Sequence, residues 1–215
     1  AQIYQSYGAH YTGESLQARY KELVKQAEES IAKEKQVTYP EIDLTVIFVQ
    51  LYLESHSTGA SVHHLKEWGR LIARTFRVLS RKRLELYPHT KEVLEDMKAA
   101  GCRLYLLSNA QADFTNPEID SAGLREIFHD IYLSSDAGIR KPQSEFLVKV
   151  IKEHQLNPDK TVMVGNDFTT DVAVAKSIGM QSILINTFPY SDEELRDRSQ
   201  AGVRVIRDIQ ELQEV

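Results

Sequence analysis

Three short stretches carry the residues best suited to chemistry, and the first ends a strand pattern. The apolar run Val162–Gly165 is followed by Asn166 and Asp167, and Asp171 comes four residues later. Carboxylates after a buried strand stand where α/β sheets place their chemistry. If a helix begins between the two acids, they lie close together and a divalent cation would relieve their repulsion. The alternative is that they only cap a helix N-terminus.

The other two stretches could bind a phosphoryl group. Leu104–Leu107 is an apolar strand pattern followed by Ser108 and Asn109, so a hydroxyl and the next backbone N–H could point together at a phosphoryl oxygen. Lys141 precedes Pro142, which favours an extended backbone at the lysine. A loop lysine buries little area, so we expect its replacement to affect chemistry more than folding. The alternatives are ordinary turn chemistry for the Ser-Asn pair and a solvated charge for the lysine.

The order and spacing of these stretches resemble motifs two, three and four of the haloacid dehalogenase-like hydrolase superfamily, in the branch with a helical cap. The resemblance covers most of the chain from Tyr87 to Val215. It implies a magnesium ion and a phosphoryl-transfer site. Many members have an acidic residue where this chain has Asn166, which lowers the charge of the site by one. By this resemblance the catalytic residues are Ser108, Lys141 and Asp171, the substrate contacts Ser108, Asn109 and Lys141, and the metal ligands Asn166, Asp167 and Asp171.

The family's first motif, an Asp-x-Asp-x-Thr that carries the nucleophile, does not occur in this sequence. In the family, the strand that bears it lies between those that correspond here to 103–107 and 161–164. Removing it would leave unpaired backbone groups in the core. We therefore expect about 10–20 further residues upstream of Ala1 and no activity without them. Alternatively, the apolar run 46–49 fills this position, although Asp43 precedes that run and a nucleophile must follow its strand.

The chain divides into two patterns that would position these residues. Residues 1–85 have helical spacing and are expected to form the cap. Residues 86–215 alternate short apolar runs with amphipathic helices, which is typical of a doubly wound, Rossmann-like α/β sheet. Ser15 is expected to cap the first long helix and Tyr39-Pro40 to open the second. Helices are predicted near 15–27, 39–53, 61–79, 90–100, 118–122, 144–155, 169–178 and 208–213, and strands at 103–107, 131–133, 161–164 and 182–185.

Composition narrows the class of protein. The chain has 215 residues, of which 42% are hydrophobic, enough for a buried core. Its net charge of −5, without a long basic run, excludes nucleic acid and anionic membranes as expected partners. No segment approaches the ~20 apolar residues of a membrane span. The single cysteine, Cys102, indicates a reducing compartment, so we expect a cytoplasmic protein.

Taken together, these patterns favour a magnesium-dependent phosphatase of a small phosphorylated metabolite that works through an aspartyl-phosphate. A 2-haloacid dehalogenase is the close alternative, because those relatives share the fold, the Ser-Asn pair and the lysine. They need no metal, however, and the Asn166, Asp167, Asp171 group therefore favours the phosphatase. A non-catalytic binding or regulatory protein that keeps the fold is the third hypothesis. The substrate and the oligomeric state stay open.

Overall fold

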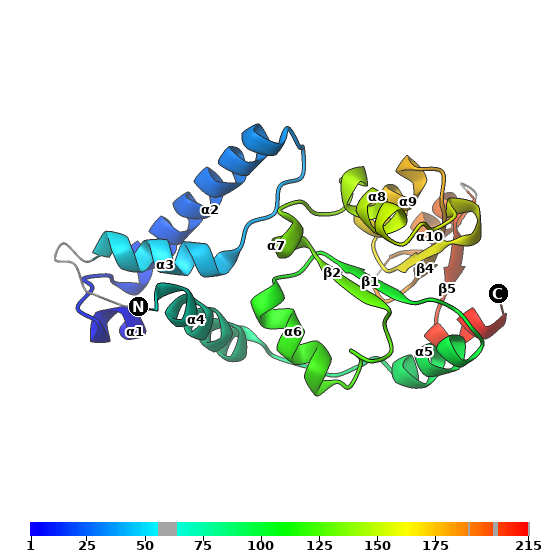
Figure 1. Cartoon of the computed structure of the whole chain (residues 1–215), viewed down its shortest axis with the longest axis horizontal. Coiled ribbons are helices and arrows are strands. Elements are labelled where there is room, and N and C mark those ends of the chain that lie inside the picture. Colours follow the sequence, from blue (N-terminus) through cyan, green and yellow to red (C-terminus); the bar gives the residue numbers. More distant parts are fainter. Residues whose placement is uncertain (56–63, 189, 200–201, 215) are drawn as a thin grey trace.

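The computed structural model describes residues 1–55, 64–188, 190–199 and 202–214, which form a helical segment and an α/β part (Figure 1). None of the helices in these ranges is long and apolar enough to cross a membrane. The boundary predicted at residue 85 lies in the link between the helices α4 (Leu65–Ser80) and α5 (Thr90–Ala99). The helical segment contains α1 (Gln2–Ser6), α2 (Gly13–Lys35), α3 (Leu44–Ser55) and α4 (Leu65–Ser80).

Two of the predicted helix starts are wrong. Thr12, not Ser15, is the N-cap of α2: its hydroxyl accepts from the Ser15 backbone N–H, and the Ser15 hydroxyl accepts from the Thr12 N–H. Helix α3 begins at Leu44 rather than at Tyr39-Pro40, because Pro40 forms an antiparallel bridge with Ile139 of the α/β part. The predicted start of the third helix, at residue 61, lies outside the described residues.

Aromatic side chains fill the core of the helical segment. Tyr52 and Trp68 pack with ring centroids 4.5 Å apart, and Tyr4 meets Trp68 edge-on at 5.6 Å. Such pairs stabilise a core beyond the area they bury. Phe48, which lies in this core, belongs to the apolar run 46–49. That run is therefore part of helix α3, as its longer spacing predicts, and not a strand of the sheet.

The α/β part contains two parallel sheets among the described residues. β1 (Tyr105–Ser108) pairs with β2 (Asp130–Leu133), and β3 (Val162–Gly165) pairs with β4 (Gln181–Ile185), which pairs with β5 (Arg204–Ile206). The α/β class is thus confirmed, and the sheet is split between β1 and β3, where the family's first strand is expected to be missing. No pairing joins β1 to β3 within the described ranges.

The helical elements of this part are α5 (Thr90–Ala99), α6 (Ala112–Ser121), α7 (Ser134–Ala137), α8 (Ser144–Glu153), η1 (Pro158–Lys160), η2 (Phe168–Val172), α9 (Ala173–Ser177), α10 (Asp192–Ser199) and η3 (Ile209–Glu214).

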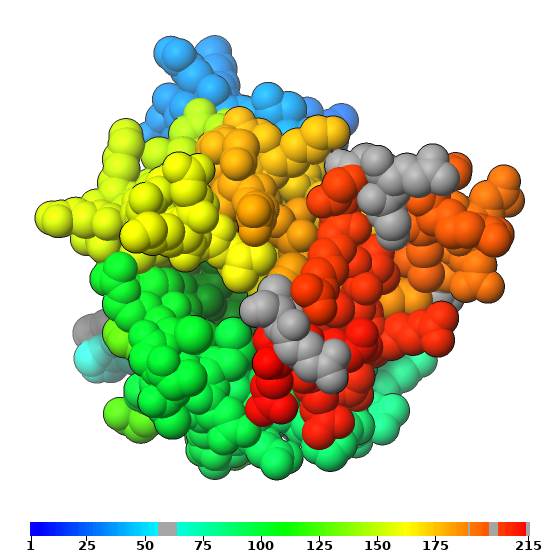
Figure 2. Space-filling model, turned by 90° about the vertical axis from the view of Figure 1, so that its right-hand side faces the viewer, coloured from blue at the N-terminus to red at the C-terminus, as the bar shows by residue number. Residues whose placement is uncertain are grey.

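Several of these elements differ from the prediction. Helix α6 begins six residues earlier than the predicted 118, and Pro117 lies inside it. The helix predicted at 169–178 opens with a single π-helical turn, η2, before α9. The last helix is a 3-10 helix, and the short elements α1, α7, α10 and β5 carry too little periodicity to be predicted. Figure 2 shows the C-terminal segment against α5, where Gln213 donates to Asp96 at 2.9 Å.

Helix α6 is one support of the helical segment on the α/β part. The Thr45 hydroxyl of α3 donates to the Asp113 carboxylate at 2.6 Å. Further along α6, the Arg77 guanidinium of α4 forms a bidentate pair with Glu118. Phe114 also packs against the apolar core of the helical segment. The two parts are therefore joined along one helix face by polar and apolar contacts.

Candidate active site

Lys141 is buried between the two sheets rather than solvated. Lys141 as a whole is 7% exposed. Its side-chain ammonium donates to the Leu107 carbonyl of β1 at 2.7 Å and to the Asp171 carboxylate at 2.6 Å. A lysine is fully buried almost only when it is paired. The expectation that this loop lysine buries little area is therefore wrong. Its charge lies where the ends of β1 and β3 come together.

Asp171 faces Lys141 and not its neighbour Asp167. One carboxylate oxygen accepts from Lys141, and the other accepts from the backbone N–H groups of Asn166 and Asp167 at 2.9 and 3.1 Å. The aspartate therefore holds the loop after β3 and compensates the buried ammonium at the same time. The repulsion that sequence reasoning assigned to the acidic pair is relieved by these donors.

Gly165, the last residue of β3, makes this close approach possible. A Cβ placed on it would overlap the Asp171 side chain, including its carboxylate. Only glycine leaves room for the carboxylate to reach the backbone of the next two residues. The single π-helical turn of η2 carries Asp171, and such turns are frequent at functional sites.

Ser108 ends β1 and Asn109 follows it, and the two side chains have different surroundings. The Asn109 amide donates to the Lys141 carbonyl at 3.0 Å and accepts from the Lys141 N–H at 2.8 Å. These reciprocal bonds set the backbone from which the lysine side chain turns inward. Ser108 is half-buried at the strand end. The structure thus brings Ser108, Asn109, Lys141 and Asp171 together. The Asn109 side-chain amide is bonded to the Lys141 backbone.

Asn166 and Asp167 carry the side-chain oxygens of the loop after β3 that could bind a metal ion. Burial alone would raise the pKa of the Asp167 carboxyl, but hydrogen bonds from Thr169 and Thr170 outweigh it and lower that pKa. The carboxylate is therefore ionised at neutral pH. The Asn166 amide nitrogen donates to Thr187, so the amide oxygen is the atom that could accept a further contact. Among the described residues no three His, Cys, Asp or Glu side chains form a metal site.

A magnesium ion suits this pair of residues. Magnesium is commonly held by one or two carboxylates together with waters and a substrate phosphate. A carboxylate and an amide oxygen at adjacent positions are hard donors of the required kind. A pocket of about 290 Å³ opens next to Asn166, at the ends of β3, β4 and β5. Ser108 and Lys141 are not in its wall, so Asn166 alone of the predicted site lines it.

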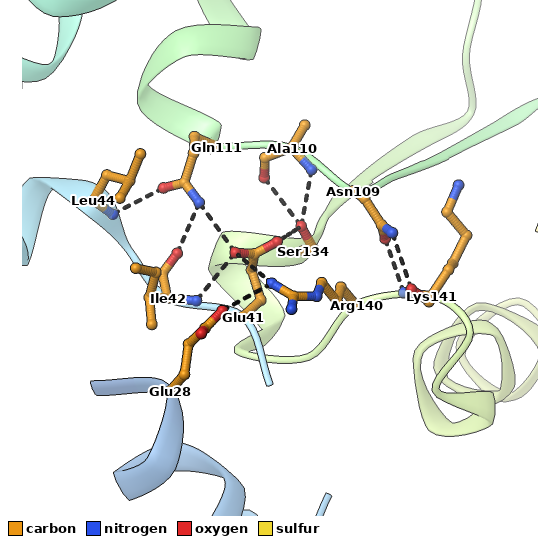
Figure 3. A network of polar contacts seen from close by, with 10 residues as sticks. All are labelled: Glu28, Glu41, Ile42, Leu44, Asn109, Ala110, Gln111, Ser134, Arg140 and Lys141. Carbon is orange, nitrogen blue, oxygen red and sulfur yellow. Dashed lines mark hydrogen bonds and ion pairs between the residues drawn. The ribbon is translucent and has the colours of Figure 1, made fainter. Parts of the chain in front are cut away.

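A second polar group beside the motifs escapes sequence reasoning. The residue Glu41, which is 9% exposed, lies in the connector 36–43 between α2 and α3. It accepts from the Ser134 hydroxyl at 2.8 Å and from the Gln111 amide at 3.3 Å (Figure 3). Residues 41 and 134 are 93 positions apart. No local signal marks Glu41, because the connector also carries a second acid, Asp43, two residues later.

Comparison with known proteins identifies the family pattern. A family model described as haloacid dehalogenase-like hydrolase matches residues 11–185. A glyceraldehyde 3-phosphate phosphatase from Methanothermobacter thermautotrophicus is 29% identical over 133 residues, which cover 61% of this chain and 59% of that protein. A phosphoglycolate phosphatase from Vibrio vulnificus is 30% identical over 109 residues, 51% of this chain and 47% of that protein. The chain thus matches less than two thirds of the length of these relatives.

Solved structures share the fold. A 2-haloacid dehalogenase from Pseudomonas syringae pv. Tomato superposes with a TM-score of 0.65 at 17% identity, covering 95% of this chain and 80% of the other. A HAD-hydrolase from Bacillus subtilis, solved bound to magnesium, has a TM-score of 0.53 at 18% identity, covering 98% and 86%. Both likenesses support the Rossmann-like core with a helical segment.

Proposed function

Because this chain belongs to the haloacid dehalogenase-like hydrolase family, we propose that it is a phosphatase of a small phosphorylated metabolite. The observation that carries the proposal is the Lys141 ammonium, buried between the Leu107 carbonyl of β1 and the Asp171 carboxylate after β3. A fixed positive charge at this place can offset the charge of a transferring phosphoryl group. The phosphatase names of the two relatives support the substrate class.

In the reaction we propose, an aspartate carboxylate attacks phosphorus and the ester P–O bond breaks, its electron pair going to the alcohol oxygen. Water then cleaves the aspartyl-phosphate to give inorganic phosphate and the free carboxylate. Ser108 orients the phosphoryl oxygens through its hydroxyl. Lys141 holds its charge beside them, kept in place by Asp171 and by the Asn109 amide. Splitting one displacement into two lowers the barrier of each.

The nucleophile belongs, in this proposal, to a strand that pairs between β1 and β3. Neither strand has a partner on its second edge among the described residues. The β1 strand has one buried residue and β3 has none, so these edges are only partly covered. An open row of backbone N–H and C=O groups is a template for pairing with a further strand. The complete gene product can be quenched during turnover and mapped by mass spectrometry. A phosphoryl group found on a residue within 1–215 would contradict this placement.

Asp167 and Asn166 would hold a magnesium ion, with Asp171 as their support rather than as a ligand. A bound magnesium would polarise the phosphoryl oxygens as a Lewis acid. Asp167 contributes an ionised carboxylate because its pKa is lowered. Asn166 contributes a neutral oxygen, which makes the site one charge less negative than an acidic pair would.

Residues 1–85 would act as the cap and 86–215 as the catalytic core. The helical segment has its own aromatic core, as a separate cap would. The contacts of the segment along α6 place it near the site. Substrate choice would then depend on side chains of the cap. A reducing, cytoplasmic location fits this proposal, since Cys102 is a free, exposed thiol.

The test is a screen of phosphorylated metabolites with the complete gene product, following phosphate release with magnesium and with excess chelator. We expect release from at least one substrate, loss of activity in chelator, and loss of most activity and of magnesium dependence in Asp167→Asn. Equal turnover in chelator would contradict the metal assignment and favour dehalogenase chemistry, read out as halide release from 2-haloacids. No turnover of either substrate class would favour a binding protein.

A further inference from the structure

The connector 36–43 of the helical segment touches the loops that carry the predicted catalytic groups. Its backbone pairs with the loop before Lys141: the Glu41 N–H donates to the Gly138 carbonyl at 3.1 Å, and the Arg140 N–H donates to the Tyr39 carbonyl at 3.0 Å. On the other side of Lys141, the Gln143 side chain accepts from two backbone N–H groups of the connector. The lysine is thus flanked by two attachments to the connector.

The loop after Ser108 and Asn109 is held to the same region. The Gln111 amide nitrogen donates to the Ile42 carbonyl at 2.8 Å, and its oxygen accepts from the Leu44 N–H at 2.9 Å. The Gln111 side chain therefore bonds to the backbone both at the end of the connector and at the start of α3. Both motif loops consequently meet the helical segment within residues 38–44.

Glu41 is the group that joins these contacts (Figure 3). One carboxylate oxygen accepts from the Ser134 hydroxyl at 2.8 Å, and Ser134 in turn accepts from the Ala110 N–H at 2.8 Å. The other oxygen accepts from Gln111 and lies 3.9 Å from the Arg140 guanidinium. A buried carboxylate is stable only with such donors. It therefore ties the connector to the residues directly after β1 and directly before Lys141.

We propose that Glu41 is a positioning residue, whose carboxylate holds the connector against both motif loops so that Ser108 and Lys141 reach their working geometry. The proposal rests on the proposed phosphatase function for its kinetic consequence. Its structural consequence, ordered loops at 39–44 and 138–141, does not depend on that function. Glu41 makes no contact with the reacting groups in this role; it acts through Ser134, Gln111 and Arg140.

The test compares Glu41→Ala with Glu34→Ala, a matched loss of an exposed glutamate on the neighbouring helix α2. We expect kcat to fall about 10–100-fold in Glu41→Ala with a smaller change in KM, because small displacements at a reacting centre cost that much. Glu34→Ala should match the unchanged protein. Glu41→Gln, which keeps the size and one acceptor oxygen, should lie between them.

Hydrogen exchange supplies a readout that needs no activity. Glu41→Ala should speed amide exchange in 39–44 and 138–141 and leave β3–β5 unchanged. Ser134→Ala, a small change at a fully buried site, removes the same link and keeps the test open if the first variant does not fold. The double variant should lose no more kcat than Glu41→Ala alone, since the two residues share one interaction.

The outcomes separate the two claims. Faster exchange in both loops without any phosphatase activity in the unchanged protein would sink the proposed function but support the link through Glu41. Unchanged exchange in both loops would overturn the positioning role. So would faster exchange with an unaltered kcat, because the loops would then be ordered by Glu41 without consequence for the reaction.

Discussion

Replacing Asp171 by Asn should destabilise the protein strongly as well as inactivate it. The Lys141 and Asp171 side chains are 8% and 9% exposed, and their charged atoms are 2.6 Å apart. Removing one partner of a buried pair leaves the other charge uncompensated, which costs about 3–5 kcal/mol. The new amide nitrogen would also face another donor, either the Lys141 ammonium or the two backbone N–H groups that Asp171 now accepts from. For a chain of this size the loss lowers the melting temperature by about 6–20 °C.

The assay is urea unfolding followed by circular dichroism, with thermal melts as a second measure. Glu29→Gln is the matched control, since it also removes one carboxylate from a Lys–Glu pair. That pair joins Lys25 and Glu29 at 3.8 Å, with side chains 77% and 67% exposed. Water screens such pairs, so this control should leave the free energy of unfolding unchanged within error.

A free energy of unfolding for Asp171→Asn within about 1 kcal/mol of the unchanged protein would refute the reasoning, because the penalty follows directly from burial. It would mean that water reaches the ammonium in solution. Lys141→Met offers an independent check. It removes the charge and keeps the volume of the side chain, so it should inactivate the enzyme. It should also destabilise the protein, contrary to what a solvated loop lysine would do.

Three further changes have definite expected outcomes. Gly165→Ala should cost about 1–3 kcal/mol in urea unfolding and most activity, since its Cβ overlaps Asp171; Gly13→Ala, where the Cβ meets nothing within 4 Å, should be neutral or stabilising. The folded protein lowers the pKa of the Asp167 carboxyl, so the stability that this carboxylate contributes is present above its unfolded-state pKa and is lost as the pH falls through its folded-state pKa. Unfolding measured over a series of acidic pH values should therefore show the difference in stability between the unchanged protein and Asp167→Asn disappearing below about pH 4. Ser108→Ala should raise KM and lower kcat in the phosphatase assay without changing urea unfolding, because the half-buried hydroxyl contributes little to the core.

The sequence predicts the strand ends well because the signals there are local. An apolar run that stops at a small or polar residue marks the end of a buried strand, and both Ser108 and Gly165 stand within one residue of the predicted end. The alternation of strands and helices after residue 86 predicts the α/β class for the same reason. These patterns depend on neighbours only a few positions away.

Side-chain placement was harder because it depends on partners far along the chain. The burial of Lys141 follows from Asp171, 30 positions later, and no local pattern reveals it. Pro40 is a good first residue for a helix, yet pairing with Ile139 keeps it extended. The Glu41 network joins positions that only the docking of the helical segment brings together.

Two lines of contact, besides the Glu41 network, limit how the helical segment can move. One runs along α6, through Asp113, Phe114 and Glu118, and the other runs along the loop 137–143, where the Lys35 ammonium also donates to the Ala137 carbonyl at 2.7 Å. Because the helical segment is held at both places, it could rotate about one set of contacts only if the other set were broken. The line along α6 includes apolar packing, while the line at 137–143 consists of hydrogen bonds and ion pairs. A rotation of the helical segment about α6 would therefore require breaking the polar contacts that flank Lys141.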